Sequence, residues 1–169
     1  PTRELAAQVG ETILSLGKDL GVRSAVVFGG VGINPQKAAI AKGLDFLVAT
    51  PGRLLDLMNQ GFAGLSKTHI LILDEADRML DMGFLPDLKR ILKALPPDRQ
   101  TLLFSATFSP EIKKLASEFL NKPESVEIER NKDSSLVRQT LYRVPKANKH
   151  TVLRDLIVDN QWDQVLVFT

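Results

Sequence analysis

The stretch His69-Ile70-Leu71-Ile72-Leu73-Asp74-Glu75-Ala76-Asp77 joins an apolar run to three carboxylates within four residues. A strand that is covered on both faces has a short, continuous apolar sequence, so residues 70–73 indicate a buried strand. Because unpaired carboxylates are costly to bury, Asp74 and Glu75 are expected where this strand opens into a cleft. In open α/β sheets, ligands bind at this carboxyl end of the strands.

The acidic residues admit two interpretations. Adjacent carboxylates can bind Mg2+, usually through water, and activate an attacking water, as they do in phosphoryl-transfer ATPases. Alternatively, Asp74, Glu75 and Asp77 only stabilise the N-terminus of a helix by interacting with its dipole. Short acidic motifs have many false positives, so these residues alone leave both interpretations open.

The composition is that of an ordinary globular protein of 169 residues, with 44% hydrophobic and 25% charged residues. This length suffices for one domain plus part of another. The sequence contains neither an apolar stretch long enough to span a membrane nor an initial signal pattern, so no membrane association is predicted. The absence of cysteine and the presence of two histidines exclude a disulfide framework and thiolate or histidine-rich metal sites, and favour a cytoplasmic location.

The net charge of +2 identifies no partner, because basic and acidic residues are equally numerous over the first 130 residues. If RNA binds, it must do so through locally placed donors and not through a general basic field.

Strand and helix signals alternate along the chain. A helix capped by Thr2 is expected to bury Leu5, Val9, Ile13, Leu16 and Leu20 and to stop at Gly21, and further helices are expected after Asn34, Pro51, Pro86, Ser109 and Asn148. Strands are expected over 24–28, 45–49, 70–73, 101–104, 125–129, 139–144 and 164–168. This alternation predicts an α/β fold, a parallel sheet with helices on both faces. The polar, aperiodic residues 130–137 are interpreted as a linker between a first domain, 1–129, and the beginning of a second, 138–169.

Five short motifs are spread along the chain: Pro1-Thr2-Arg3-Glu4-Leu5-Ala6-Ala7-Gln8, Gly29-Gly30, Thr50-Pro51-Gly52-Arg53, Asp74-Glu75-Ala76-Asp77 and Ser105-Ala106-Thr107. Their order and spacing resemble those of DEAD-box RNA helicases. The flanking residues 78–84 and 100–104 resemble the bacterial members, particularly the RhlE-like group.

This resemblance implies two RecA-like domains that clamp ATP and RNA between them. Asp74 would then hold Mg2+ through water, and Glu75 would activate the water that attacks ATP. The family also implies that Asp77 bonds to Ser105 and Thr107 and couples the ATP site to the clamp. Without the family, Ser105 and Thr107 would be interpreted as caps of the following helix.

By the same resemblance, RNA is contacted through its backbone, without base recognition. Glycine permits close approach of a phosphate, helix N-termini favour anions, and Thr and Arg donate hydrogen bonds to phosphate oxygens. Taken singly, the glycines could only serve turns, and the arginine could be a solvated charge. The implied residues are Pro1, Thr2, Arg3, Gly29, Gly30, Thr50, Pro51, Gly52 and Arg53.

Two C-terminal segments match the family more weakly. Residues 139–144 resemble the opening strand of its second domain, and 165–169 resemble a motif in which Phe168 and Thr169 would shape the RNA groove. Trp162 could stack on a base, but packing beside a strand is the interpretation we favour.

The sequence contains no phosphate loop of the form G-x-x-x-x-G-K-[ST]. We therefore expect an internal fragment of an ATP-dependent RNA helicase that hydrolyses no ATP alone, and that is marginally stable or prone to aggregate. The alternatives are a noncatalytic RNA-binding module and a fragment without independent function. A different enzyme, such as a DNA helicase, is opposed by the combination of the Asp74-Glu75-Ala76-Asp77 and Ser105-Ala106-Thr107 motifs.

Overall fold

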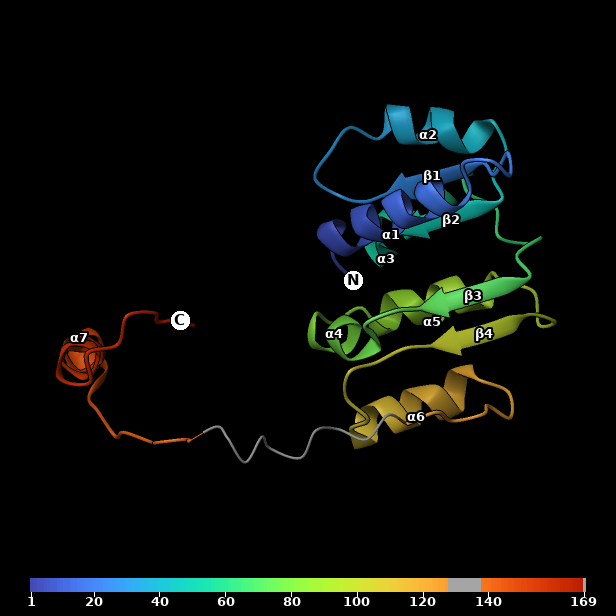
Figure 1. Cartoon of the computed structure of the whole chain (residues 1–169). Coiled ribbons are helices and arrows are strands. Elements are labelled where there is room, and N and C mark those ends of the chain that lie inside the picture. Colours follow the sequence, from blue (N-terminus) through green and yellow to red (C-terminus); the bar gives the residue numbers. More distant parts are fainter. Residues whose placement is uncertain (128–137, 169) are drawn as a thin grey trace. The chain divides into compact units, whose positions relative to one another are not determined.

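The computed structural model describes residues 1–127 and 138–168, and the chain divides into two compact units, Pro1–Glu124 and Ser125–Thr169. Within the first unit, strands and helices alternate, and Figure 1 shows its strands running in the same direction. The predicted linker over 130–137 lies outside the described residues.

The strands of the first unit form two parallel pairs. Strand β1 (Ser24–Val27) pairs with β2 (Phe46–Ala49), and β3 (Ile70–Leu73) pairs with β4 (Gln100–Leu103). Each lies within one residue of its predicted position. Parallel pairing places the carboxyl ends of paired strands at the same edge, where the candidate site residues follow.

Six helices of the described part of unit 1 cover these strands: α1 (Arg3–Leu16), α2 (Asn34–Ala41), α3 (Pro51–Asn59), α4 (Ala76–Asp81), α5 (Leu85–Lys93) and α6 (Pro110–Phe119). A Cβ at Gly10 of α1 would clash with Val26, whereas Leu57 of α3 packs with Val27. Because successive strand residues face opposite sides, α1 and α3 cover opposite faces, which confirms the predicted layering.

Two details of the predicted helices are wrong. Helix α1 ends at Leu16, and its buried residues are Ala6 and Gly10, whereas Leu16 and Leu20 are each 77% exposed. The small residues let α1 approach β1 closely, while Leu5, Val9 and Ile13 of the predicted stripe are partly buried, so the stripe is wrong only for Leu16 and Leu20. Asn34 does not cap α2, because Ile33 already has helical dihedral angles and takes the cap position.

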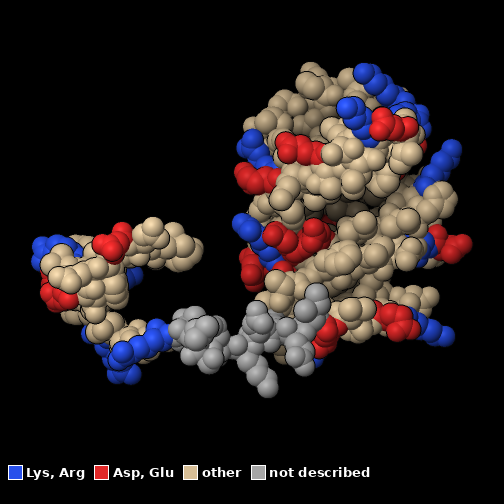
Figure 2. All heavy atoms as spheres, in the orientation of Figure 1, with Lys and Arg blue, Asp and Glu red and all other residues tan. Residues whose placement is uncertain are grey.

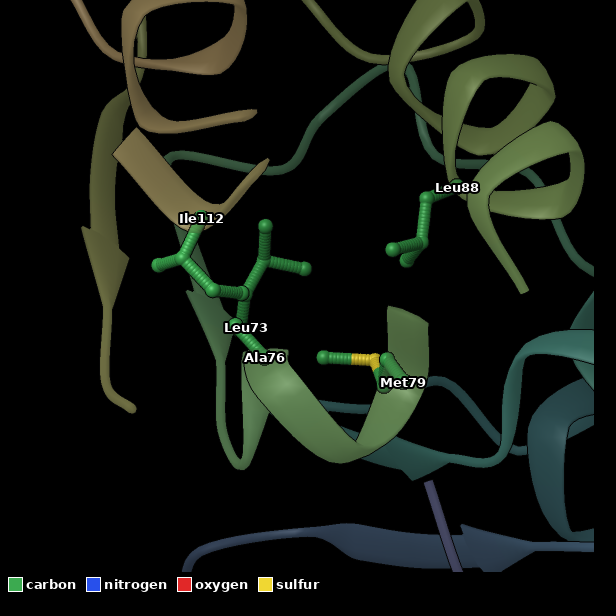
Figure 3. Packing of buried hydrophobic residues seen from close by; sticks show 5 residues of the cluster. All are labelled: Leu73, Ala76, Met79, Leu88 and Ile112. Carbon is green, nitrogen blue, oxygen red and sulfur yellow. The ribbon is translucent and has the colours of Figure 1, made fainter. Parts of the chain in front are cut away.

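Three clusters of buried side chains hold the first unit together. The cluster in Figure 3 joins β3 to α4, α5 and α6 through Leu73, Ala76, Met79, Leu88 and Ile112. A second cluster packs Val27, Leu57 and Ala63 beside β1. The third, Leu55, Ile91 and Leu95, packs α3 against α5 and thereby links the two strand pairs.

Strand β3 is covered on one face only, which corrects the expectation that it is buried on both. Leu73 is 6% exposed, but Ile70 and Ile72 on the opposite face are 56% and 58% exposed. Phe46 of β2 is 49% exposed, and β2 and β3 are not hydrogen-bonded to each other. The described residues therefore leave an apolar face and unpaired strand edges uncovered.

We expect this 169-residue chain, when produced alone, to associate through these strand edges. Unpaired edges with exposed apolar side chains are templates for intermolecular pairing. Size-exclusion chromatography and a thermal melt followed by circular dichroism would measure this. A monomeric chain with a single cooperative melt would contradict the expectation.

The second unit contains one turn of 3-10 helix, η1 (Lys146–Asn148), followed by α7 (Lys149–Asp159) in its described residues. Asn148 precedes α7 but makes no side-chain capping bond. The strands predicted over 139–144 and 164–168 are absent, and Leu141 and Phe168 are each 89% exposed. A strand requires a neighbouring strand and a covering layer, and the described residues of this short unit provide neither.

Two smaller predictions near the C-terminal unit are also not met. Residues 125–127 form no strand, and 128–129 lie outside the described residues. Trp162 is 48% exposed, so the packing expected for it is not present.

The described part of the chain contains no helix of the length and hydrophobicity needed to cross a membrane. Basic and acidic side chains are interspersed over the visible face of the first unit (Figure 2), as the balanced charge predicts.

Candidate functional site

The acidic residues lie at the carboxyl end of β3, where the chain turns directly into α4. The Ala76 N–H donates to the Phe104 carbonyl at 3.0 Å, and the Phe104 N–H donates to the Leu73 carbonyl at 2.8 Å. These two bonds extend the β3–β4 ladder past both strands. They bring the turn after β3 beside the segment after β4, which contains Ser105 and Thr107.

Glu75 occupies a left-handed backbone conformation, with φ 50° and ψ 52°. Such a conformation is uncommon outside glycine and is held here by its surroundings. The Glu75 N–H donates to Asp74 Oδ1 at 2.9 Å, which ties the two acidic residues together. Glu75 Oε2 is buried without a hydrogen-bond partner, and the nearest cation, Arg78 Nη1, lies 3.8 Å away. The carboxylate therefore retains an unused acceptor.

Asp77 contacts the segment after β4. The Thr107 N–H donates to Asp77 Oδ2, and the Arg78 N–H donates to Asp77 Oδ1, both at 3.0 Å. Partial burial raises the pKa of Asp77, but the hydrogen bonds from Thr107 and Arg78 outweigh it and lower the pKa below its usual value. The carboxylate thus stays ionised and links the two predicted motifs.

Ser105 and Thr107 are not the caps of the following helix. Ser109 caps α6, because its Oγ accepts a bond from the Ile112 N–H at 3.3 Å. The Ser105 hydroxyl instead donates to the Thr107 carbonyl at 2.8 Å. The Thr107 N–H bonds to Asp77, whereas the hydroxyl proton of Ser105 is used within its own segment.

The three segments predicted to contact RNA border one cavity of about 370 Å³ in the first unit. They follow β1, follow β2 and open α1, so the parallel pairing of β1 and β2 brings them to one edge. Of the nine predicted residues, Thr2, Gly30 and Pro51 do not line the cavity, and Thr2 caps α1 by accepting a bond from the Leu5 N–H. The lining residues are Pro1, Arg3, Gly29, Thr50, Gly52, Arg53, Asp56 and Phe84.

Arg3 packs against the glycine loop. Its guanidinium lies 5.3 Å from the centroid of the Phe28 ring. Gly30 has φ +78°, and a Cβ at this position would lie 2.6 Å from Arg3 Nη1. The backbone conformation favours glycine at this position, and a side chain there would displace the end of the Arg3 side chain.

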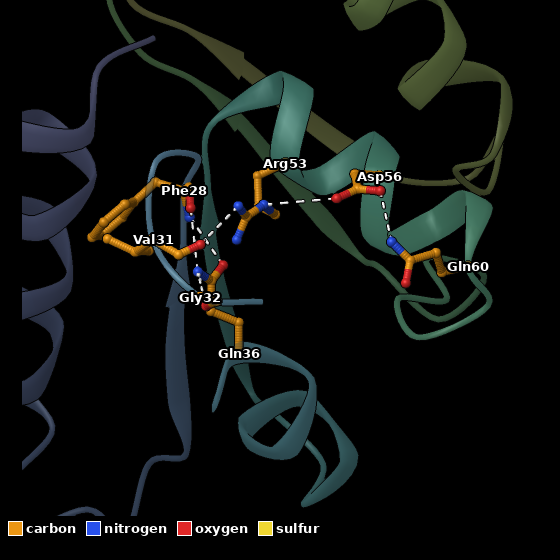
Figure 4. Close-up of polar contacts among 7 residues, drawn as sticks. All are labelled: Phe28, Val31, Gly32, Gln36, Arg53, Asp56 and Gln60. Carbon is orange, nitrogen blue, oxygen red and sulfur yellow. Dashed lines mark hydrogen bonds and ion pairs between the residues drawn. The ribbon is translucent and has the colours of Figure 1, made fainter. Parts of the chain in front are cut away.

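Arg53 is not a solvated charge. Its side chain is 12% exposed, its Nη2 donates to the Val31 carbonyl at 3.0 Å, and its Nε lies 3.9 Å from Asp56 Oδ2 (Figure 4). Its Nη1 is buried and has no hydrogen-bond partner. An unpaired guanidinium N–H is costly to bury, so this donor suits an anionic ligand such as a phosphate.

Gln36, which the sequence did not predict to be functional, is 8% exposed and bonds to the loop after β1. Its burial and its bonds could not be predicted from the sequence, because a glutamine in a surface helix is ordinarily solvated.

The described residues contain no group of three or more His, Cys, Asp or Glu side chains that could hold a metal ion. Mg2+ does not require such a group, because it is commonly bound through one or two carboxylates, waters and substrate phosphates. Asp74 with the unused acceptor of Glu75 fits this mode of binding.

Comparison with known proteins identifies the family. Residues 1–115 match the DEAD/DEAH box helicase family, to which this chain belongs. It is 44% identical to the ATP-dependent RNA helicase RhlB of Pseudomonas putida over 99% of the chain and 43% of that protein, and 44% identical to the ATP-dependent RNA helicase CshA of Limosilactobacillus reuteri over 99% of the chain and 34% of that protein. The chain therefore spans less than half the length of these relatives. These names do not test the resemblance to the RhlE-like group, which stays a prediction.

Solved structures confirm the RecA-like fold class. A hypothetical ATP-dependent RNA helicase from Sulfolobus tokodaii matches with a TM-score of 0.69 and 43% identity, over 73% of this chain and 37% of that chain. A DEAD box protein from Methanococcus jannaschii matches with a TM-score of 0.68 and 45% identity, over 72% of this chain and 33% of that chain.

Proposed function

We propose that this chain is part of an ATP-dependent RNA helicase, an RNA-dependent ATPase that unwinds or remodels RNA duplexes in the cytoplasm. The observation that carries the proposal is the turn after β3, where Asp74 and Glu75 lie together and Glu75 Oε2 has no hydrogen-bond partner. Family membership and the names of the relatives support the same activity.

In this proposal Asp74 holds Mg2+ through water, and Glu75 orients and deprotonates the water that attacks ATP. The ion would neutralise charge on the ATP phosphates. Asp77 stays ionised because the hydrogen bonds from Thr107 and Arg78 lower its pKa, so it can hold the segment after β4 in place without exchanging a proton. This contact supports its proposed role in coupling the ATP site to RNA.

RNA is proposed to bind through its backbone at the edge formed by Pro1, Thr2, Arg3, Gly29, Gly30, Thr50, Pro51, Gly52 and Arg53. The unpaired Nη1 of Arg53 and the N-terminus of α3 would both favour a phosphate. Phosphate contacts carry no base information, so the proposed binding is independent of RNA sequence.

The proposal is tested by RNA-stimulated ATP hydrolysis, measured for this chain and for the full-length protein that contains it. We expect hydrolysis only by the full-length protein, because the phosphate-loop motif is absent from these residues. ATP hydrolysis by the short chain would contradict the expectation that the phosphate-loop motif is required.

A noncatalytic RNA-binding module is the second candidate, because the Arg53 donor and its cavity lie within this chain. RNA binding by the full-length protein without any response to ATP would favour it.

A further inference from the structure

Gln36 is a buried amide whose hydrogen-bonding groups are all directed at one loop. It lies on α2, and its Oε1 accepts a bond from the Phe28 N–H at 3.2 Å. Its Nε2 donates to the Phe28 carbonyl and to the Gly32 carbonyl, each at 3.2 Å. Both Nε2 hydrogens are therefore used, and reversing the amide would place oxygen against two carbonyls and nitrogen against an N–H. Only one orientation of the side chain satisfies this site.

These bonds close the loop 28–32 at its base (Figure 4). Gln36 pairs with both the N–H and the carbonyl of Phe28, as a neighbouring strand would, and so continues the pairing of β1 by one residue. Its second donor holds Gly32 across the loop. The backbone of Gly29 and Gly30 is thereby fixed between two anchored residues.

The same loop contacts both arginines of the cavity edge. The Val31 carbonyl accepts the bond from Arg53 Nη2 at 3.0 Å, and the Phe28 ring lies under the guanidinium of Arg3. A shift of the loop would consequently move a bonding partner of each arginine. Gln36 itself is buried and does not line the cavity.

We propose that Gln36 is a positioning residue for the binding of the RNA backbone: by closing the loop 28–32 it holds Gly29, Gly30 and the two arginines in one binding geometry. The inference rests on the proposed function. It assigns to Gln36 an effect on RNA binding that is separate from the chemistry of ATP hydrolysis, which takes place after β3.

The test measures RNA-stimulated ATP hydrolysis by the full-length protein with Gln36→Leu and Gln36→Glu. Leucine removes all three bonds, whereas glutamate keeps the acceptor for the Phe28 N–H and turns the second oxygen toward two carbonyls. Because buried groups would be left unpaired, we expect KM for RNA to rise about tenfold or more, with kcat at saturating RNA and KM for ATP changed by less than about twofold. Lowering the pH should partly restore RNA binding by Gln36→Glu, because a protonated carboxyl can donate to one carbonyl.

Gln100→Leu is the matched control. Gln100 is the exposed first residue of β4 and does not line the cavity, so its replacement should leave KM for RNA unchanged. A thermal melt of each variant checks that it is folded. If Gln36→Leu does not fold, the test is made with Gln36→Glu. The inference would be overturned if folded variants had the wild-type KM for RNA. It would also be overturned if kcat fell while KM for RNA and KM for ATP both rose. Neither result would affect the proposed function. A wild-type protein that does not bind RNA would overturn the proposed function and this inference with it.

Discussion

Replacing Glu75 with glutamine in the full-length protein is expected to lower RNA-stimulated ATP turnover by about 10²–10⁴-fold, the usual contribution of a positioned general base. Glutamine retains the size of the side chain but cannot take a proton from water. Because Asp74, Asp77 and the cavity edge are unchanged, binding of ATP and RNA should persist. Steady-state turnover, with nucleotide and RNA binding measured separately by fluorescence, distinguishes lost chemistry from lost binding.

The matched control for this prediction is Asp81→Asn. Asp81 is an exposed carboxylate at the end of α4, the helix that begins immediately after Glu75. Its neutralisation changes the charge of the same short helix without altering the turn after β3, so turnover should stay near that of the wild type. Turnover by Glu75→Gln within a few-fold of the wild type would contradict the role given to Glu75.

Ile112→Ala is expected to lower the free energy of unfolding by about 2–5 kcal/mol, and Ile112→Val by about 0.5–1.5 kcal/mol. Ile112 is 1% exposed and packs with Leu73, Ala76 and Met79, the residues that flank or follow the acidic turn. Truncation leaves a cavity beneath that turn. Chemical denaturation of the full-length protein measures the change.

Leu16→Ala provides the contrast, because Leu16 is 77% exposed at the end of α1. Exposed substitutions usually change the free energy of unfolding by less than about 0.5 kcal/mol. If Ile112→Ala and Leu16→Ala had equal effects, the packing shown in Figure 3 could not be the core of this unit.

The strands of the first unit could be predicted from sequence because their signals are local. Each is a short apolar run bounded by turn residues, and the acidic residues follow directly after the run that ends at Leu73. The pairing that brings Asp77 to Thr107 is not local. Only the resemblance to a known family placed Ser105 and Thr107 in that contact, since their spacing alone favoured helix caps.

The predictions that were wrong concern residues whose burial or secondary structure depends on a neighbouring element. The apolar stripe of α1 extends to Leu16, which is exposed, whereas the buried residues of the helix are Ala6 and Gly10, and Gly10 lies in close contact with Val26. Residues 139–144 have the alternation of a strand, but the described part of their unit contains no strand to pair with them. The role of Gln36 was not predicted because its hydrogen-bonding partners are backbone groups, which do not depend on the residue type.

The register of β3 and β4 determines where the chain can vary in length. Leu73 pairs with Leu103, and Asp77 bonds to Thr107, so both contacts join residues thirty positions apart. An insertion between α5 and β4 lies outside the paired residues and can be absorbed there. An insertion between Leu103 and Thr107 would move Thr107 away from Asp77 while the strands stayed paired. Relatives that keep this contact are therefore expected to differ in length before β4 and to have a constant spacing after it.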